Sequence, residues 1–165
     1  MVYTKGIKLI EYKELMEEWD WGKNNALDLK PNYLLCGSNK KAWWICQYGH
    51  EWEATINSRY RGLGCPYCSG RRILPGYNDF ATKFSVLMTE WDFDKNTFID
   101  PTRVGAADKT KVWWICEKGH QYEAAISNRS NGQRCPYCTG KKVFSGINDL
   151  VTLNPEILSE WDYEK

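Results

Sequence analysis

The feature that most constrains the fold of this chain is a set of cysteines and histidines that occurs twice, 70 residues apart. In each set a Cys and a His separated by three residues precede two Cys separated by two residues, and fourteen residues lie between the pairs. The residues are Cys46, His50, Cys65 and Cys68, and then Cys116, His120, Cys135 and Cys138. Thiolates and imidazoles delivered as two close pairs are the ligands that tetrahedral zinc prefers. The sequence therefore predicts two structural Zn²⁺ ions, because four protein ligands leave no open position for a substrate.

The repeat extends well beyond these ligands. Residues 43–50 and 113–120 are identical at six of eight positions. The same register continues without a gap as far as Asp79 and Asp149. A repeat of this length predicts one module that occurs twice with the same structure.

Local patterns predict the elements of the module. Residues 42–46 and 51–56 are rich in aromatic and β-branched side chains and flank a Gly-containing turn, which is typical of a β-hairpin. The sequence Cys-Pro-Tyr-Cys at 65–68 predicts a tight knuckle, since proline fixes one backbone angle. Farther along, either Asn78 or Asp79 is expected to cap a helix.

A shorter element, Glu-Trp-Asp, occurs three times, at 18–20, 90–92 and 160–162. Each copy has an apolar residue four positions before its Trp, which predicts that both side chains lie on one face of a helix. These apolar residues are Leu15, Leu87 and Ile157. A zinc module follows the first two copies in this sequence but not the third. The third copy is thus either a capping helix or part of a longer array.

These patterns divide the chain into five segments. We expect an N-terminal helical spacer (1–30), a zinc module (31–77), a second helical spacer (78–100), a second zinc module (101–147) and a C-terminal helical segment (148–165). A unit of about 70 residues has little margin of stability, because its conformational entropy nearly cancels its hydrophobic gain. Structural zinc contributes roughly 10 to 16 kcal/mol in small modules, enough to decide whether they fold.

The cysteines admit two further interpretations, and both are weaker than zinc binding. Seven is an odd number, and six of the seven fall into matching sets, which argues against a disulfide framework and favours a reducing, cytoplasmic compartment. Cys-Pro-Tyr-Cys also resembles a redox pair, but a Gly-rich loop precedes it where a redox fold has a strand. Iron is an alternative to zinc in such a site. Cys36 has no partner, its counterpart in the second copy is Ala106, and it is expected to be a connector residue.

Basic residues are concentrated in the two zinc modules, although the formal net charge of the chain is only +1. Residues 36–75 and 105–145 each carry a net charge of +4, so the remaining segments are acidic. Clustered cations in two equivalent modules favour contact with phosphates, through counterion release and avidity. The candidate nucleic-acid-binding residues are Lys40, Lys41, Arg59, Arg61, Arg71, Arg72, Lys111, Arg129, Arg134, Lys141 and Lys142.

The basic and aromatic residues are also compatible with roles that involve no nucleic acid. The charges could serve only solubility and offset the negative charge of the thiolates. The aromatic hairpins or acidic helices could instead dock another polypeptide, which would make the protein an adaptor for a nuclease or a defence complex. Most tryptophans are expected in the core, whereas an exposed Trp52 or Tyr122 would favour stacking on single-stranded bases.

The arrangement Trp-Trp-x-Cys-x-x-Gly-His, then Cys-Pro-x-Cys-x-Gly, with Glu-Trp before it, resembles a zinc-ribbon family of treble-clef-like domains of unknown function. The similarity covers nearly the whole chain. It implies a small metal-stabilised α+β fold of two tandem zinc-ribbon or treble-clef-like modules, each a β-hairpin plus a Cys-Pro-x-Cys knuckle, joined by short helices. The family occurs as tandem copies in bacterial and viral proteins, sometimes beside endonuclease domains of the very-short-patch repair type, which implies work on nucleic acid.

The sequence thus predicts a non-catalytic zinc-binding repeat protein that binds nucleic acid, DNA in preference to RNA. Both histidines are committed to metal, and no nucleophile-base or phosphate-loop signature remains for an enzyme. No stretch is long and apolar enough for a membrane span, and no small-molecule substrate is expected.

Overall fold

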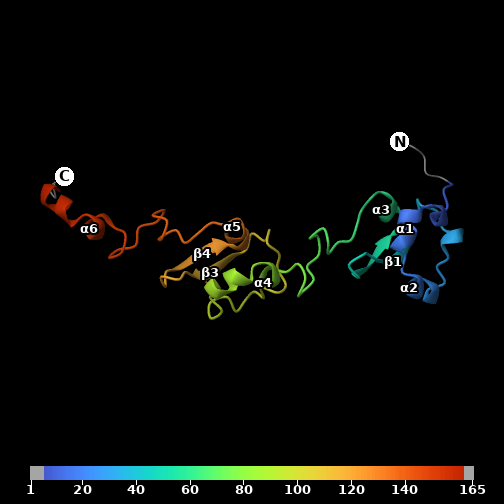
Figure 1. Ribbon diagram of the computed structural model, residues 1–165, viewed down its shortest axis with the longest axis horizontal. Helices are drawn as coiled ribbons and strands as arrows, with labels where there is room; N and C mark the ends of the chain where they lie inside the picture. The colour runs from blue at the N-terminus through green and yellow to red at the C-terminus, as the bar shows by residue number, and fades with distance from the viewer. Residues whose placement is uncertain (1–5, 162–165) are drawn as a thin grey trace. The chain divides into compact units, whose positions relative to one another are not determined.

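The computed structural model of the protein describes residues 6–161, and the chain divides into two compact units, Met1–Arg72 and Ile73–Lys165 (Figure 1). The boundary between the units lies inside the segment 31–77 that the sequence assigns to the first zinc module. The helical segment before each hairpin belongs to the same unit as that hairpin. Among the described residues, no helix combines the length and the apolar character needed to cross a membrane.

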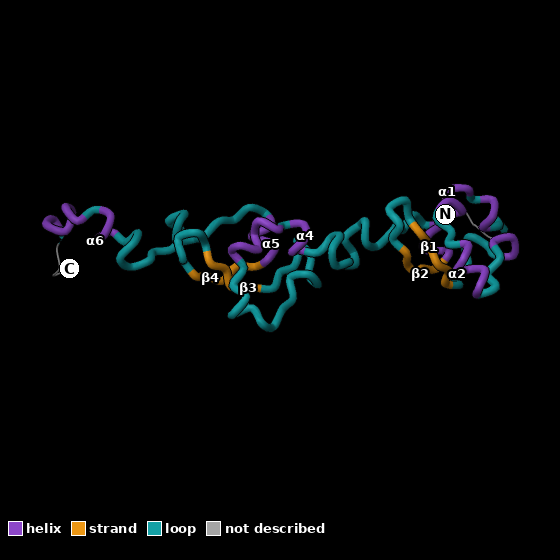
Figure 2. Tube along the Cα trace, turned by 60° about the horizontal axis from the view of Figure 1, so that its bottom comes forward, coloured by secondary structure: helices purple, strands orange, loops and turns teal. Residues whose placement is uncertain are grey.

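Each unit contains a two-stranded antiparallel hairpin among short helices and long loops (Figure 2). The elements of the first unit are η1 (Leu9–Glu11), α1 (Lys13–Glu17), α2 (Trp21–Ala26), η2 (Pro31–Tyr33), β1 (Lys41–Ile45), β2 (Glu51–Thr55) and α3 (Ile56–Tyr60). Those of the second unit are α4 (Phe80–Lys83), η3 (Ser85–Glu90), β3 (Lys111–Ile115), β4 (Gln121–Ala125), α5 (Ile126–Ser130), α6 (Leu150–Leu153) and η4 (Pro155–Glu160). The predicted small α+β fold with two tandem hairpin modules is confirmed.

One face of each hairpin carries the aromatic core. In the first unit Trp44 of β1 lies opposite Trp52 of β2, and in the second unit Trp114 of β3 lies opposite Tyr122 of β4. All four side chains are buried. The exposed Trp52 or Tyr122 that would have favoured base stacking is therefore not found, and both residues serve the core.

The Trp of each Glu-Trp-Asp element lies beyond the end of the helix before it, so the predicted shared helix face is wrong. Helix α1 ends at Glu17, while Trp19 forms a β-bridge with Trp44. Trp91 follows η3 in extended backbone and bridges Trp114 in the same way. The two ring pairs are edge to face, with centroids 5.2 and 5.3 Å apart. The bridge is favoured because it pairs backbone groups along the open edge of the hairpin, which a helical Trp could not do.

A buried asparagine extends this edge pairing in each unit. The side-chain amide of Asn24 donates to the carbonyl of Trp43 and accepts from its N–H, both at 2.8 Å. Asn96 makes the same two bonds to Trp113, again at 2.8 Å. The amide thus replaces one residue of a third strand. Neither asparagine was predicted from the sequence.

Side-chain caps begin several of the short helices. Asp79, one of the two predicted caps, accepts a hydrogen bond from the N–H of Thr82 at 2.9 Å at the start of α4. Thr55 accepts one from the N–H of Ser58 at the start of α3. At the corresponding position of the second unit, Ala125 has no side-chain acceptor for α5. The two hairpin modules therefore differ by one cap.

Candidate metal centres

The first four predicted ligands converge on one point in the first unit. Cys46 directly follows β1 and His50 directly precedes β2, so the hairpin turn holds this pair, while Cys65 and Cys68 come from the knuckle. Their ligand atoms all lie within 4.8 Å of one another. Cys36 is buried in the core of the unit and does not belong to this group.

The distances between the ligand atoms fit a tetrahedral zinc ion. With Zn–S near 2.3 Å and Zn–N near 2.0 Å, tetrahedral geometry requires about 3.8 Å between two sulfurs and about 3.5 Å between a sulfur and a nitrogen. The Sγ atoms of Cys46 and Cys68 are 3.8 Å apart. The Nδ1 atom of His50 lies 3.4, 3.2 and 3.7 Å from the Sγ atoms of Cys46, Cys68 and Cys65. The imidazole therefore presents Nδ1 to the metal.

The second unit repeats this geometry closely. Nδ1 of His120 lies 3.4, 3.3 and 3.7 Å from the Sγ atoms of Cys116, Cys138 and Cys135. The Sγ atoms of Cys116 and Cys138 are 3.7 Å apart. The same ligand arrangement thus occurs in both units. Each holds a structural zinc ion in a closed Cys3His site.

Backbone amides prepare the hairpin cysteines to bind a cation. Burial alone would raise the pKa of Cys46, but hydrogen bonds from the N–H groups of Tyr48 and His50 lower it below the ordinary value for a thiol. The turn that supplies them requires Gly49, whose φ is 78°. In the second unit burial and hydrogen bonds with neighbouring thiolates raise the pKa of Cys138 to about 11. Three clustered thiols resist full ionisation without a cation, and a divalent metal removes that obstacle.

Arg59 and Arg129, two of the predicted phosphate contacts, are buried in ion pairs and not exposed. Their side chains are only 6% and 4% exposed. Arg59 pairs with Glu18 and donates to the carbonyl of Leu63, and its guanidinium lies 5.2 Å from the ring of Trp44. A guanidinium is drawn into such a site by an aromatic face and a carboxylate together. These contacts make both arginines part of the framework around the metal and remove them from the candidate phosphate contacts.

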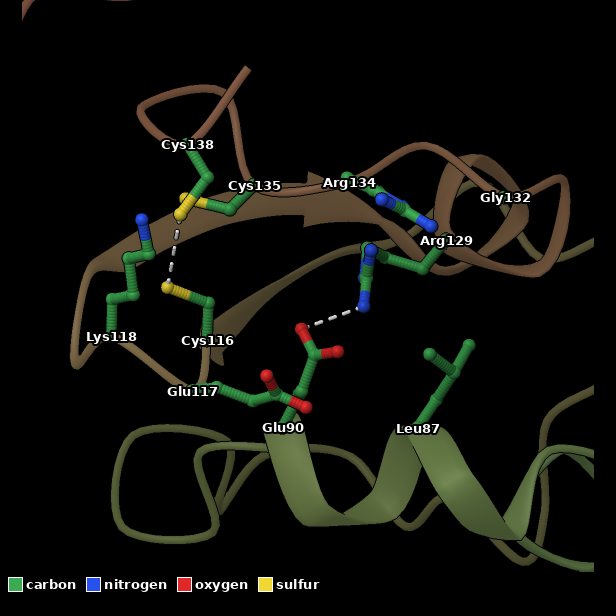
Figure 3. A pocket seen from close by; sticks show the side chains of 10 residues that line it. All are labelled: Leu87, Glu90, Cys116, Glu117, Lys118, Arg129, Gly132, Arg134, Cys135 and Cys138. Atoms are coloured by element: carbon green, nitrogen blue, oxygen red, sulfur yellow. Dashed lines mark hydrogen bonds and ion pairs between the residues drawn. The ribbon is translucent and has the colours of Figure 1, made fainter. Parts of the chain in front are cut away.

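The equivalent pair in the second unit joins Arg129 and Glu90 at 2.6 Å (Figure 3). Glu90 is the acidic residue of the second Glu-Trp-Asp element, as Glu18 is of the first. The ion pair therefore links the helix after the hairpin to the segment before it. The sequence alone did not show that the recurrent glutamates had the recurrent arginines as partners.

The remaining nine basic candidates are exposed. They are Lys40, Lys41, Arg61, Arg71, Arg72, Lys111, Arg134, Lys141 and Lys142. Arg71 donates to the carbonyl of Gly64 at 2.6 Å and to the Ser69 hydroxyl at 2.9 Å, which holds it against the knuckle. The Nζ atom of Lys41 lies 3.4 Å from the Oε2 atom of Glu53, with which it forms an ion pair.

A pocket of about 530 Å³ opens beside the metal ligands of the second unit (Figure 3). It lies between η3 and the zinc site, and Cys116, Cys135 and Cys138 contribute to its wall. Two exposed cations, Lys118 and Arg134, also line it. The corresponding residues of the first unit are Tyr48 and Gly64, so this basic lining belongs to the second unit.

Comparison with known proteins agrees with the site. The chain is 30% identical over 102 residues to a protein of Escherichia phage T5 whose description reads "Putative endonuclease". The match covers 61% of this chain but only 32% of the phage protein, so the chain spans about a third of the length of that relative. A family model described as "Probable Treble clef zinc finger domain" matches residues 15–71 and again 87–141. With two such matches and two closed Cys3His sites, the chain belongs to this family of treble clef zinc finger domains.

Proposed function

We propose that this protein binds nucleic acid, DNA in preference to RNA, through exposed basic side chains around its two zinc modules, and that its role is non-catalytic. The observation that carries the proposal is the charge of the modules. Residues 36–75 and 105–145 each have a net charge of +4, and nine of the eleven basic candidates are exposed. The phage relative, whose description reads "Putative endonuclease", supports an association with nucleic acid.

The second unit offers one candidate phosphate site. Lys118 and Arg134 line one pocket beside the metal ligands, where Glu117 offsets one of these charges and the ion pair of Arg129 with Glu90 adds no net charge. A guanidinium and an ammonium on the same concave surface can contact one phosphate from two directions. The first unit, in which Tyr48 and Gly64 occupy these positions, would then contribute mainly through Arg61, Arg72 and the lysines of β1 and its approach.

A non-catalytic role agrees with the chemistry of the described site residues. Both histidines of the chain direct Nδ1 into a closed ligand set, so neither is available as a general base. A structural zinc with four protein ligands has no position for a water nucleophile. The modules would therefore position a nucleic acid and leave its cleavage to another active site.

The proposal is tested by titration of labelled duplex DNA, single-stranded DNA and RNA with zinc-loaded protein over a salt series. We expect micromolar or tighter binding to DNA that weakens steeply with salt. The double variant Lys118→Ala/Arg134→Ala should bind several-fold more weakly and with a salt slope smaller by about 1 to 2. Lys13→Ala/Lys30→Ala removes the same charge from exposed spacer positions and should change binding much less.

A gain of function makes the test sharper. The double variant Tyr48→Lys/Gly64→Arg gives the first unit the basic lining of the second, and a side chain at Gly64 meets open space. This variant should bind DNA more tightly than the unaltered protein. Failure to bind all three nucleic acids would reject the proposal and shift the interpretation to a protein-binding adaptor.

A further inference from the structure

The segment from Asp149 to Trp161 repeats the segment from Asp79 to Trp91, and it adopts the same local structure. Asp149 accepts hydrogen bonds from the N–H and the hydroxyl of Thr152, both at 2.9 Å, as Asp79 does from Thr82 at 2.9 and 2.7 Å. A short α-helix and then a 3-10 helix follow in both cases, α4 with η3 and α6 with η4. The third copy of the element is therefore folded locally.

Its apolar side chains, however, are exposed where those of the second copy are buried. Phe80 and Trp91 are 0% and 4% exposed, whereas the corresponding Leu150 and Trp161 are 42% and 52% exposed. Ile157, which corresponds to the partly buried Leu87, is also exposed. In the second unit the covering element is the hairpin that follows, because Trp91 packs on Trp114 and Phe80 packs on both rings.

The glutamate of the third copy is exposed as well, whereas the glutamates of the first two copies form ion pairs. Glu18 and Glu90 each pair with the arginine of the helix that follows their hairpin, Arg59 and Arg129. Glu160 occupies the corresponding position and is exposed. A partner that covered this segment in the same way would bring an arginine to Glu160 and a tryptophan to Trp161.

We propose that Asp149–Trp161 is a docking surface for a further Cys3His zinc hairpin of the same kind. Such a hairpin has a Trp at the position of Trp44 and Trp114, and an Arg at the position of Arg59 and Arg129. The matches to the family model support this pairing. They begin at Leu15 and Leu87, so one family unit comprises the Glu-Trp-Asp segment together with the hairpin after it, and Ile157 is the equivalent third starting point.

A second copy of this chain is a poorer occupant. Both of its hairpins already have their own Glu-Trp-Asp segment in place, with Trp19 and Trp91 buried against Trp44 and Trp114. Docking in trans would have to displace one of these segments and break its ion pair. A hairpin without a Glu-Trp-Asp segment of its own could dock without displacing one.

The proposal is tested with a full-length chain that is extended by a third hairpin. Lys165 corresponds to Lys95, so a copy of residues 96–148 joined directly after Lys165 supplies a third hairpin in the natural register. We expect three zinc ions per chain. The backbone amides of 150–161 should exchange with deuterium about tenfold or more slowly than in the 165-residue protein. A Glu156→Ala control should change nothing, because the equivalent Val86 is exposed in the second unit.

A charge exchange makes the result specific to docking. Glu160→Arg in the extended chain should abolish the added protection, and Arg→Glu at the copied Arg129 position should restore it. The proposal is overturned if the third hairpin loads zinc while 150–161 exchange as fast as before. It is also overturned if the 165-residue protein dimerises with this segment already protected, which would make a second copy the occupant.

Discussion

The side chain of Asn24 holds both backbone polar groups of Trp43, donating to its carbonyl and accepting from its N–H at 2.8 Å each. Asn24 lies in α2, directly after the first Glu-Trp-Asp element, and Trp43 lies in β1, so this pair fixes the helix to the edge of the hairpin. Asn96 and Trp113 repeat the relationship in the second unit.

Replacing this asparagine should weaken the unit that contains it. Asn24→Ala leaves two backbone groups of Trp43 without their partner at a buried position, which should cost about 2 to 4 kcal/mol in the free energy of unfolding. Urea denaturation of the zinc-loaded protein measures the cost. The adjacent Asn25→Ala, at an exposed position, should cost less than about 0.5 kcal/mol. Equal costs for the two variants would show that the bonds to Trp43 do not stabilise the unit.

Loss of the buried ion pair in the second unit should lower the stability of that unit without directly changing its affinity for DNA. Arg129→Met leaves Glu90 without its partner and should destabilise the unit by about 2 to 3 kcal/mol, and Glu90→Gln in the same chain should recover part of this loss. The fraction that stays folded should bind DNA as tightly as the unaltered protein. A selective loss of binding at unchanged stability would make Arg129 a candidate phosphate contact again.

The two helices that follow the hairpins offer an exchange of caps. Thr55 caps α3, whereas Ala125 provides no side-chain cap for α5. Thr55→Ala should therefore destabilise the first unit by about 1 kcal/mol, and Ala125→Thr should stabilise the second by a similar amount. Thermal unfolding of both variants tests this expectation. The melting temperature should fall for Thr55→Ala and rise for Ala125→Thr. Two shifts in the same direction would contradict the assignment of the cap.

Removal of the Asp79 cap should lower the free energy of unfolding by the same amount over a defined pH range. Burial would raise the pKa of this carboxyl group, but hydrogen bonds from the hydroxyl and N–H of Thr82 and the N–H of Gly76 hold it below the ordinary value of 3.8. A lowered folded-state pKa contributes stability above the unfolded pKa, and this is lost only as the pH falls through the folded value. Asp79→Ala should therefore cost about 1 to 2 kcal/mol at every pH from 5 to 7.

The equivalent cap on α6 provides the control for this prediction. Asp149→Ala changes a cap with the same hydrogen bonds, but the helix that follows carries exposed apolar residues and contributes less to a core. Its effect on the unfolding of the second unit should be smaller. A cost for Asp79→Ala that disappeared between pH 7 and pH 5 would show that the carboxylate is not ionised in the way its hydrogen bonds require.

The metal ligands and hairpins could be predicted from the sequence because they repeat with a fixed register. Two copies of Cys-x3-His and Cys-x2-Cys at equal spacing support each other, and the flanking aromatic residues alternate as a half-buried strand requires. The cap at Asp79 could be predicted for a similar reason, since its effect depends only on nearby residues.

What the sequence did not show are the contacts between distant segments. Arg59 and Glu18 are 41 residues apart, so the arginine was indistinguishable from a surface cation. Asn24 and Asn96 are 72 residues apart, whereas the modules repeat every 70, which placed both asparagines outside the main alignment. Trp19 has helical spacing from Leu15, yet pairing with the hairpin edge draws it into extended backbone.

The central claim is that two Cys3His sites each hold a zinc ion on which the fold of the unit depends. Metal analysis by native mass spectrometry, on protein prepared without added zinc or chelator, tests it most directly. We expect two zinc ions per chain in the unaltered protein, and about one in Cys65→Ser and in Cys135→Ser, with loss of structure confined to the altered unit. Protein that is folded without bound metal, or either variant with two zinc ions still bound, would contradict the account.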